Sequence, residues 1–147
     1  MNKLLKDLRG QYPHAVAGSC SENNCRLVVG SRKTHVIFNG KNLGGGSKMC
    51  DCIIFRNDKK IILVEIKSGK NIDVDEVIRQ FTYAGIKSRR IARAYGGRFE
   101  IFCLLLVRGQ VRNHIKRQML KSARVCICDE ALKITQGRCR SRLDSHV

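Results

Sequence analysis

Two carboxylates and one lysine lie inside or at the end of two short apolar segments of this 147-residue chain. Asp51 interrupts the apolar segment 49–55, and Glu65 and Lys67 end the apolar segment 60–67. A charge within an apolar strand is costly unless it has a partner. Glu65 and Lys67 are separated by a single residue, so in a strand both side chains point to the same face of the sheet. These three residues are the first candidates for chemistry.

The polar residues 56–59 predict a turn, so that the two apolar segments form a β-hairpin. Antiparallel pairing through this turn brings Asp51 to the end of the sheet where Glu65 and Lys67 lie. Two carboxylates held close together repel each other, and a hard cation that prefers oxygen ligands relieves this repulsion. We therefore expect Asp51 and Glu65 to bind Mg²⁺, for which Mn²⁺ can substitute, with the carbonyl of Ile66 as a further ligand.

Such a metal site suits the hydrolysis of a phosphodiester bond. A bound divalent cation polarises a phosphate oxygen and lowers the pKa of a bound water molecule. Lys67 can orient or deprotonate that water, or stabilise the charge that develops on the phosphate. The sequence therefore predicts a metal-dependent phosphodiesterase site at the end of the hairpin.

The charge of the chain points to a polyanionic partner. Lys and Arg number 29 against 12 Asp and Glu, which gives a formal net charge of +17. Nucleic acid is the first partner that such a charge suggests, and an anionic membrane surface is the second. No apolar run reaches the roughly 20 residues that a spanning helix needs, and no signal peptide is visible. We expect no membrane partner and an intracellular, cytoplasmic location, or the host cytoplasm for a viral protein.

Basic and polar side chains outside the hairpin are the expected contacts to phosphate groups. Aromatic residues make up only 5% of the chain and Trp is absent, which disfavours a stacking platform for single strands and favours backbone contacts to duplex or branched DNA. The expected nucleic-acid contacts are Ser47, Lys48, Lys70, Lys87, Arg89, Arg90, Arg93, Arg112 and Lys116.

The elements after the hairpin are predicted by periodicity and by capping residues. Asp73 starts a capping pattern, and apolar residues then recur at helical spacing to about residue 95. The further expected elements are a buried strand at 99–107, a basic helix at 111–123, a strand at 124–128 and a basic, flexible C-terminal tail at about 137–147. This order predicts one α/β domain over 1–147 with a mixed central sheet flanked by helices.

The first third of the chain is less clear. Residues 2–9 predict a short helix, and residues 39–48 predict a flexible glycine-rich loop. Segments 26–29 and 34–38 either form a hairpin, or 21–29 is a helix and 34–38 is the first strand of the sheet.

Asp51, the hairpin turn, the triplet Glu65-Ile66-Lys67 and the following helix resemble the signature of the PD-(D/E)XK nuclease superfamily. This group includes restriction endonucleases, RecB-like exonucleases and archaeal Holliday junction resolvases. The resemblance implies metal ligands at Asp51 and Glu65, a catalytic lysine at Lys67, and a restriction endonuclease-like α-β-β-β-α-β core over roughly residues 19–107. Cys50 stands where the family has a proline.

Weaker resemblances add three candidates. Gln80 and Tyr83 are similar to the Q-x-x-x-Y motif of RecB-like members, although the spacing here is Q-x-x-Y, and Gln80 is either catalytic or part of a solvated helix face. Glu22, with Asp7 as the rival, would supply the family's additional acidic residue from a first helix. The loop 44–47 is similar to the loop of archaeal resolvases that approaches a phosphate, or it is a plain loop.

The eight cysteines allow three interpretations: small buried hydrophobic residues, disulfides such as those of hyperthermophilic proteins, or metal ligands. We expect a Mg²⁺-dependent deoxyribonuclease, an endonuclease selective for branched or junction DNA that works as a homodimer. One alternative is a non-catalytic nucleic-acid-binding protein with the same fold. Another is a RecB-like nuclease whose iron–sulfur cluster is held by Cys20 or Cys25 and the C-terminal cysteines.

Overall fold

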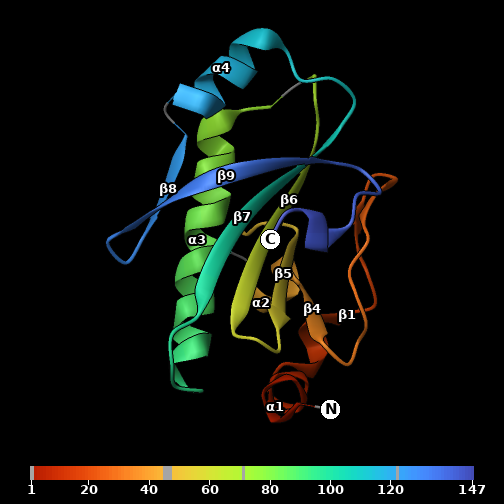
Figure 1. The fold of residues 1–147 in the computed structure, drawn as a ribbon, viewed down its shortest axis with the longest axis vertical. Coiled ribbons are helices and arrows are strands. Elements are labelled where there is room, and N and C mark those ends of the chain that lie inside the picture. Colours follow the sequence, from red (N-terminus) through yellow and green to blue (C-terminus); the bar gives the residue numbers. More distant parts are fainter. Residues whose placement is uncertain (1, 45–47, 71, 122) are drawn as a thin grey trace.

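The computed structural model describes residues 2–44, 48–70, 72–121 and 123–147, except for the side chains of 120 and 121, and it shows an α/β fold (Figure 1). Four helices pack against a mixed seven-stranded sheet with the strand order β1-β4-β5-β6-β7-β9-β8. The helices are α1 (Lys3–Gln11), α2 (Gly40–Gly44), α3 (Val74–Arg93) and α4 (Asn113–Lys121). The strands are β1 (Val16–Ala17), β2 (Cys20–Glu22), β3 (Cys25–Leu27), β4 (His35–Asn39), β5 (Cys52–Arg56), β6 (Lys60–Ser68), β7 (Glu100–Arg108), β8 (Arg124–Ile127) and β9 (Glu130–Arg138).

The centre of the sheet confirms the elements predicted with the clearest patterns. β5 and β6 form the expected antiparallel hairpin, and β6 pairs in parallel with β7 over its full length, from Lys60↔Glu100 to Ser68↔Arg108. Helix α3 is the crossover between these two parallel strands. It begins after Asp73, whose carboxylate accepts hydrogen bonds from the N–H groups of Asp75 and Glu76. The expected helix at 2–9 is also confirmed as α1.

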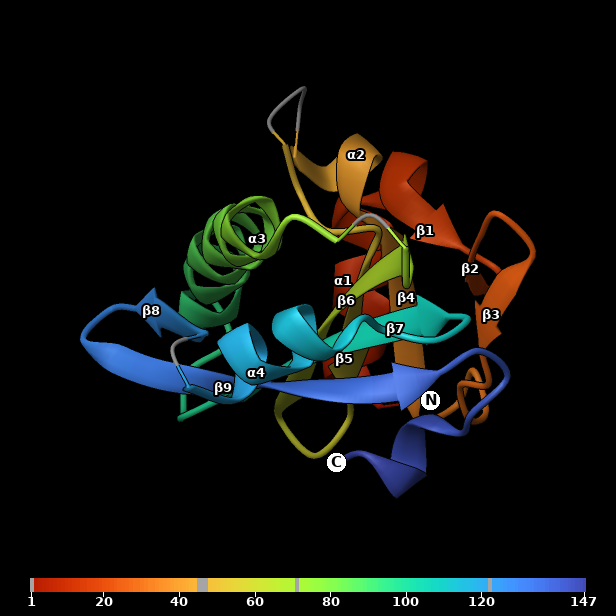
Figure 2. The ribbon, with the colours of Figure 1, turned by 90° about the horizontal axis from the view of Figure 1, so that it is seen from above.

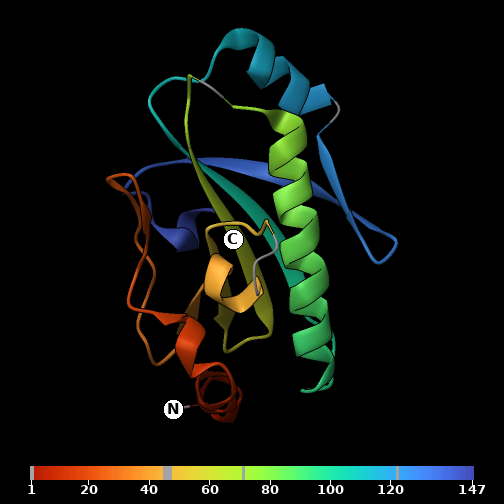
Figure 3. The ribbon, with the colours of Figure 1, turned by 180° about the vertical axis from the view of Figure 1, so that it is seen from behind.

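The two faces of the sheet are covered by different parts of the chain. Buried side chains of all four helices, such as Leu8, Leu43, Phe81 and Ile115, form one core with alternate residues of the strands. The opposite face is covered by the β2–β3 hairpin and by the short C-terminal turn η2 (Leu143–Ser145). Figure 2 shows α3 and η2 on opposite sides of the sheet, and Figure 3 shows the helical side. The central strands β5, β6 and β7 therefore bury both their odd and their even residues.

The β2–β3 hairpin corrects part of each alternative for the region 21–38: no helix forms at 21–29, and the strands at 26–29 and 34–38 do not pair, but the strand expected at 34–38 is confirmed as β4. β3 pairs with β2 and not with 34–38, and the turn between them is formed by Asn23 and Asn24, which have φ values of 48° and 62°. Asparagine tolerates this left-handed conformation, so the Asn-Asn pair selects the tight turn. β4 is instead a strand of the main sheet between β1 and β5.

Two disulfides join this hairpin to the rest of the chain. Cys20 is bonded to Cys52 in β5, and Cys25 is bonded to Cys139 after β9. Cys50 and Cys103 are free and buried. Both sequence interpretations, disulfides and buried apolar side chains, are thus confirmed for different cysteines. The proposed iron–sulfur cluster on Cys20 or Cys25 is wrong, because both are bonded to another cysteine.

The C-terminal tail predicted to be flexible is ordered, and that prediction was wrong. Residues 130–138 form β9, which pairs in parallel with β7 and antiparallel with β8. Beyond it, the Leu143 side chain is fully buried, and the Leu143 N–H donates to the Val28 carbonyl. The strand carries no strong apolar pattern, because its only half-buried aliphatic residues, Leu132 and Ile134, alternate with exposed ones.

The predicted flexible loop at 39–48 is also partly wrong, because Gly40–Gly44 forms α2. Residues 45–47, including the expected phosphate contact Ser47 and most of the loop 44–47, lie outside the described residues. None of the helices in the described part of the chain combines the length and hydropathy needed to cross a bilayer.

Candidate active site

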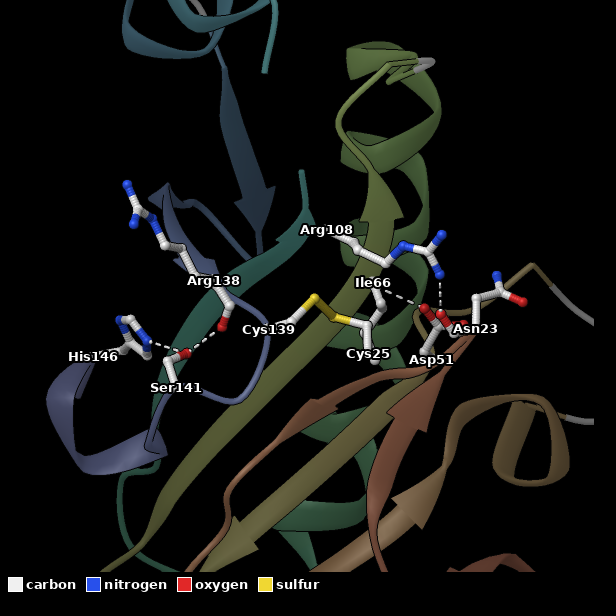
Figure 4. Close-up of a disulfide and its surroundings, with 9 residues drawn as sticks. All are labelled: Asn23, Cys25, Asp51, Ile66, Arg108, Arg138, Cys139, Ser141 and His146. Atoms are coloured by element: carbon white, nitrogen blue, oxygen red, sulfur yellow. Dashed lines mark hydrogen bonds between the residues drawn. A yellow bond between two sulfur atoms is a disulfide. The ribbon is translucent and has the colours of Figure 1, made fainter. Parts of the chain in front are cut away.

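The hairpin register places Asp51 beside the end of β6. The β5–β6 ladder ends at the pair Cys52↔Val64, so Asp51 and Glu65 are the next residues on the two chains. The Asp51 carboxylate replaces a strand partner here: its Oδ2 accepts a hydrogen bond of 2.8 Å from the N–H of Ile66 (Figure 4). In a ladder, the N–H and the C=O of one residue face the same neighbour. The Ile66 carbonyl therefore faces the Asp51 side, as a metal ligand would require.

Tight backbone contact holds the Asp51 segment in place. The N–H of Gly40, at the start of α2, donates to the Asp51 carbonyl over 2.9 Å. A Cβ atom at Gly40 would lie only 1.7 Å from the carbonyl oxygen of Cys50. Only glycine permits this approach, so the sequence Asn39-Gly40 fixes the position of a carboxylate that comes eleven residues later.

Glu65 is an acid in an unfavourable environment. Its side chain is only 1% exposed, and its Oε2 has no hydrogen-bond partner among the described residues. Burial is the main cause that raises the pKa of Glu65 to about 9, and the hydrogen bond and charge of Asp51 raise it further. Lys67 opposes this shift. A buried carboxyl group beside a second carboxylate is the arrangement that a divalent cation relieves.

Lys67 lies at the mouth of the site. It follows Glu65 on the same side of β6, which faces α3. Its Nζ is 4.0 Å from Oε1 of Glu76, in the first turn of α3. Glu76 is the fourth residue of the D-x-x-E capping pattern that begins at Asp73, and its place in the sequence indicates no other role. The signal that could have found it is the spacing of Glu76 and Gln80, which places both on one side of α3.

Gln80 is half-buried on α3. Its Oε1 is buried and has no hydrogen-bond partner in the described part of the chain. Gln80 and Glu76 line a pocket of about 400 Å³ together with Lys48, Arg79 and Tyr83. The pocket is connected to Lys67 through Glu76, which lines it and also forms the ion pair with the Lys67 ammonium. The expected phosphate contact Lys48 lines the same pocket.

Glu22 lies on β2, which corrects its expected place on a first helix. It lines a pocket of about 380 Å³ with Ile66, Lys67 and Arg108. Arg108 donates to the carbonyl of Asn23 over 2.8 Å, next to Glu22 (Figure 4). No hydrogen bond or ion pair between described residues joins Glu22 to Asp51 or Glu65. Glu22 therefore borders the site on the Lys67 side without contacting the carboxylates.

Asp7, the rival of Glu22, is far from the site. Tyr95 follows the last turn of α3, and its pKa is raised first by burial and then by the charge of Asp7. Asp7 therefore lies near the C-terminal end of α3. Glu76, which contacts Lys67, lies in the first turn of the same helix. A helix of 20 residues is about 30 Å long, so Asp7 cannot act together with Lys67.

Most of the predicted phosphate contacts are solvent-accessible. Arg89 differs: it donates to Oε2 of Glu130 over 2.7 Å and to the Phe99 carbonyl over 2.6 Å. These bonds tie α3 to β9 and to the start of β7, which argues against a phosphate contact by Arg89. The remaining predicted residues at least partly exposed to solvent are Lys48, Lys70, Lys87, Arg90, Arg93, Arg112 and Lys116.

The oxygen atoms available at the site suit a cation that keeps several of its coordinated water molecules. Within the described ranges, no three or more His, Cys, Asp or Glu side chains are grouped to hold a metal ion. Asp51, Glu65 and the Ile66 carbonyl supply two carboxylates and one neutral oxygen. Mg²⁺ is commonly bound by one or two carboxylates with several waters, so this set fits Mg²⁺ better than a soft metal.

Comparison of the chain with models of known families, with curated proteins and with solved structures finds no match. The resemblance described above thus depends on the residues and on their placement in the fold. The placement brings together Asp51, Glu65 and Lys67, whereas Gln80 lies in a neighbouring pocket and Glu22 lies at the border.

Proposed function

We propose that this protein is a metal-dependent nuclease that hydrolyses phosphodiester bonds of DNA, with Mg²⁺ held by Asp51, Glu65 and the Ile66 carbonyl. The observation that carries the proposal is the meeting of two carboxyl groups, one of them buried with an oxygen that lacks a hydrogen-bond partner. When β1 to β3 and α2 are left out, the order α1-β4-β5-β6-α3-β7 matches the α-β-β-β-α-β core of the PD-(D/E)XK superfamily, to which we assign the chain as part of the proposal. The first helix of this order is α1, which lies before the range 19–107 expected from the sequence.

Asp51 and Glu65 would hold the metal, and the N–H of Ile66 fixes the orientation of the Asp51 carboxylate. When bound there, the metal would polarise a phosphate oxygen and lower the pKa of a coordinated water. Lys67 orients the attacking water and neutralises charge on the scissile phosphate. Glu76 restrains the Lys67 ammonium on the helix side, and Gln80 positions water or a phosphate oxygen in the adjoining pocket.

The positive net charge of the chain supports DNA as the substrate. A net charge of +17 with few aromatic residues suits contacts to the DNA backbone, made by side chains such as Lys48, Arg112 and Lys116. Such contacts give affinity without sequence readout. We propose duplex or branched DNA as the substrate and a symmetric homodimer as the working form, since a dimer presents two equivalent sites to two strands.

The test is cleavage of supercoiled plasmid and of four-way junctions with Mg²⁺, with Mn²⁺ and with chelator. Glu65→Gln and Lys67→Met should each lower the cleavage rate at least about 100-fold, because each removes a group that acts on the reacting phosphate. Binding of junction DNA in chelator should change little. Glu100→Gln is the matched control, since Glu100 is exposed at the opposite end of the paired strands β6 and β7.

Two results would overturn the proposal. Equal cleavage by wild type and both variants would remove catalysis from this site. Tight DNA binding by wild type without any metal-dependent cleavage would make the protein a non-catalytic nucleic-acid-binding protein.

A further inference from the structure

A small pocket at the other end of the sheet concentrates positive charge. It encloses about 60 Å³ and is lined by Arg9 of α1, Arg26 of β3, Arg32 in the turn before β4, and His35 at the start of β4. One water molecule needs only about 10–15 Å³ of such space, so the pocket has room for a small ion. The rest of its lining is apolar residues, glycine and one serine, and no described acidic side chain contributes to it.

Part of this charge is fixed in the wall of the pocket. One guanidinium nitrogen of Arg9 donates to the carbonyls of Arg32 and His35, over 2.8 and 2.7 Å. Burial first, and then the charge of Arg32, lower the pKa of Arg9. The positively charged guanidinium groups of Arg9 and Arg32 are thus close enough to repel each other. An anion bound between them would relieve this repulsion.

His35 supplies the second, independent observation. Its side chain is only 5% exposed, and its Nε2 is buried without a hydrogen-bond partner among the described residues. Its Nδ1 lies 2.7 Å from Oγ1 of Thr34, and that hydroxyl donates to the carbonyl of Ser31. We therefore assign the proton of the neutral ring to Nδ1, which donates to Thr34 and leaves Nε2 as an acceptor without a donor.

The chemistry of the pocket selects its ligand. The arginines require an anion, and Nε2 of the neutral ring requires an O–H donor. A phosphate group that keeps a hydroxyl, as in hydrogen phosphate or a terminal phosphomonoester, has both. An internal phosphodiester of a nucleic acid has the charge but no O–H group.

We propose that Arg9, Arg26, Arg32 and His35 form a binding site for a phosphate group with a free hydroxyl, either inorganic phosphate or the terminal phosphate of a nucleic-acid strand. The site is separate from the carboxylates and does not depend on the proposed nuclease. His35 pairs with Arg56 at one end of the β4–β5 ladder, and Asn39 pairs with Cys52, next to Asp51, at the other. These ends are about 13 Å apart along the strand.

The first test is calorimetric titration of the full, oxidised chain with inorganic phosphate at constant ionic strength. Wild type should bind one phosphate in a saturable manner. Arg26→Gln and Arg32→Gln should each weaken binding at least about tenfold, since each removes a charge-assisted hydrogen bond. Both side chains extend from exposed residues, so these variants should fold. Arg98→Gln, at an exposed residue outside the pocket, is the matched control and should leave the dissociation constant unchanged.

The second test follows the histidine ring by NMR. Phosphate should shift the ring signals of His35 and leave those of the exposed His114 unchanged. Burial holds the pKa of His35 below its usual value, in a setting that includes Arg9, Arg56, Asp58 and Asp144, and this favours the neutral ring that accepts the phosphate hydroxyl. Competition by duplexes with and without a 5′-phosphate separates the two sources: preference for the phosphorylated duplex assigns a strand end, and equal competition assigns the free ion. No saturable binding with unchanged His35 signals, or equal weakening by Arg98→Gln, would overturn the site.

Discussion

Glu65 makes the folded protein sensitive to pH. Its pKa is about 9 in the folded chain, against an ordinary value of 4.5, so between these values the folded state holds a proton that the unfolded state has released. The stabilisation by the protonated form is complete below pH 4.5 and is lost as the pH rises towards 9. The residue proposed to bind the metal thus destabilises the metal-free protein at neutral and alkaline pH.

Replacing this acid should stabilise the metal-free protein. Glu65→Gln removes the ionisable group and keeps the shape, and each unit of pKa shift corresponds to about 1.4 kcal/mol. We expect the variant to be more stable than wild type by at least about 1 kcal/mol at pH 8 in chelator, with a smaller difference at pH 5. Thermal denaturation across this pH range measures the effect. A variant that is less stable than wild type at every pH would contradict it.

Gly40 is the second residue that controls the site. Gly40→Ala places a Cβ against the Cys50 carbonyl, so the segment carrying Asp51 must move. We expect a loss of stability of about 1–3 kcal/mol and a large loss of cleavage. Gly10→Ala is the control, because nothing lies within 4 Å of the added Cβ and the residue is helical, so stability should not fall. Melting temperature and plasmid cleavage distinguish the two outcomes.

At the level of elements, the β2–β3 hairpin depends on its disulfides. The Cys25–Cys139 bond spans a sequence separation of 114 residues, and the hairpin itself pairs only three residues on each strand. Cys25→Ala together with Cys139→Ala should lower the free energy of unfolding by about 3–5 kcal/mol. Urea denaturation with and without reductant measures this loss. Cys126→Ser with Cys128→Ser, which changes two exposed free cysteines, should have no effect. If the urea midpoint of the wild-type protein is the same with and without reductant, the disulfides do not stabilise the fold.

The elements that the sequence predicted share a simple pattern. The strands β5, β6 and β7 are long apolar runs, and α3 has apolar residues at helical spacing. Asp51 lies next to Glu65 because of the register of the tight β5–β6 hairpin. β9 was missed because only scattered residues such as Leu132 and Ile134 face the core between exposed polar ones. The disulfide pairing was missed because eight cysteines allow too many combinations. The place of Glu22 beside Lys67 depends on this pairing, so no local pattern could reveal it.

At the scale of the whole molecule, positive charge should dominate binding to DNA. Neutralising each phosphate releases counterions, so the logarithm of the binding constant should fall steeply with the logarithm of the salt concentration. Arg112→Gln with Lys116→Gln should lower the magnitude of this slope by up to about 2. Arg89→Gln should instead lower the melting temperature and leave the slope unchanged, because Arg89 pairs with Glu130. Fluorescence anisotropy at several salt concentrations checks both. If the slope is unchanged in the double variant, Arg112 and Lys116 do not contact the DNA phosphates.

The cytoplasmic location expected from the sequence stays a prediction, and the two disulfides argue against it. Disulfides persist mainly in oxidising compartments, although the cytosol of hyperthermophiles also contains them. The homodimer likewise stays a prediction.

The cystine between residues 25 and 139 closes a ring through the backbone, and the ring closed between residues 20 and 52 shares residues 25–52 with it. A protease that cuts an exposed connection within the larger ring, such as the one at Arg98, would open the ring without releasing a fragment. The two halves would stay covalently joined and contribute neighbouring strands, β6 and β7, to one sheet. While its disulfides stay oxidised, the protein can therefore be cleaved once in this ring and remain one covalently linked molecule.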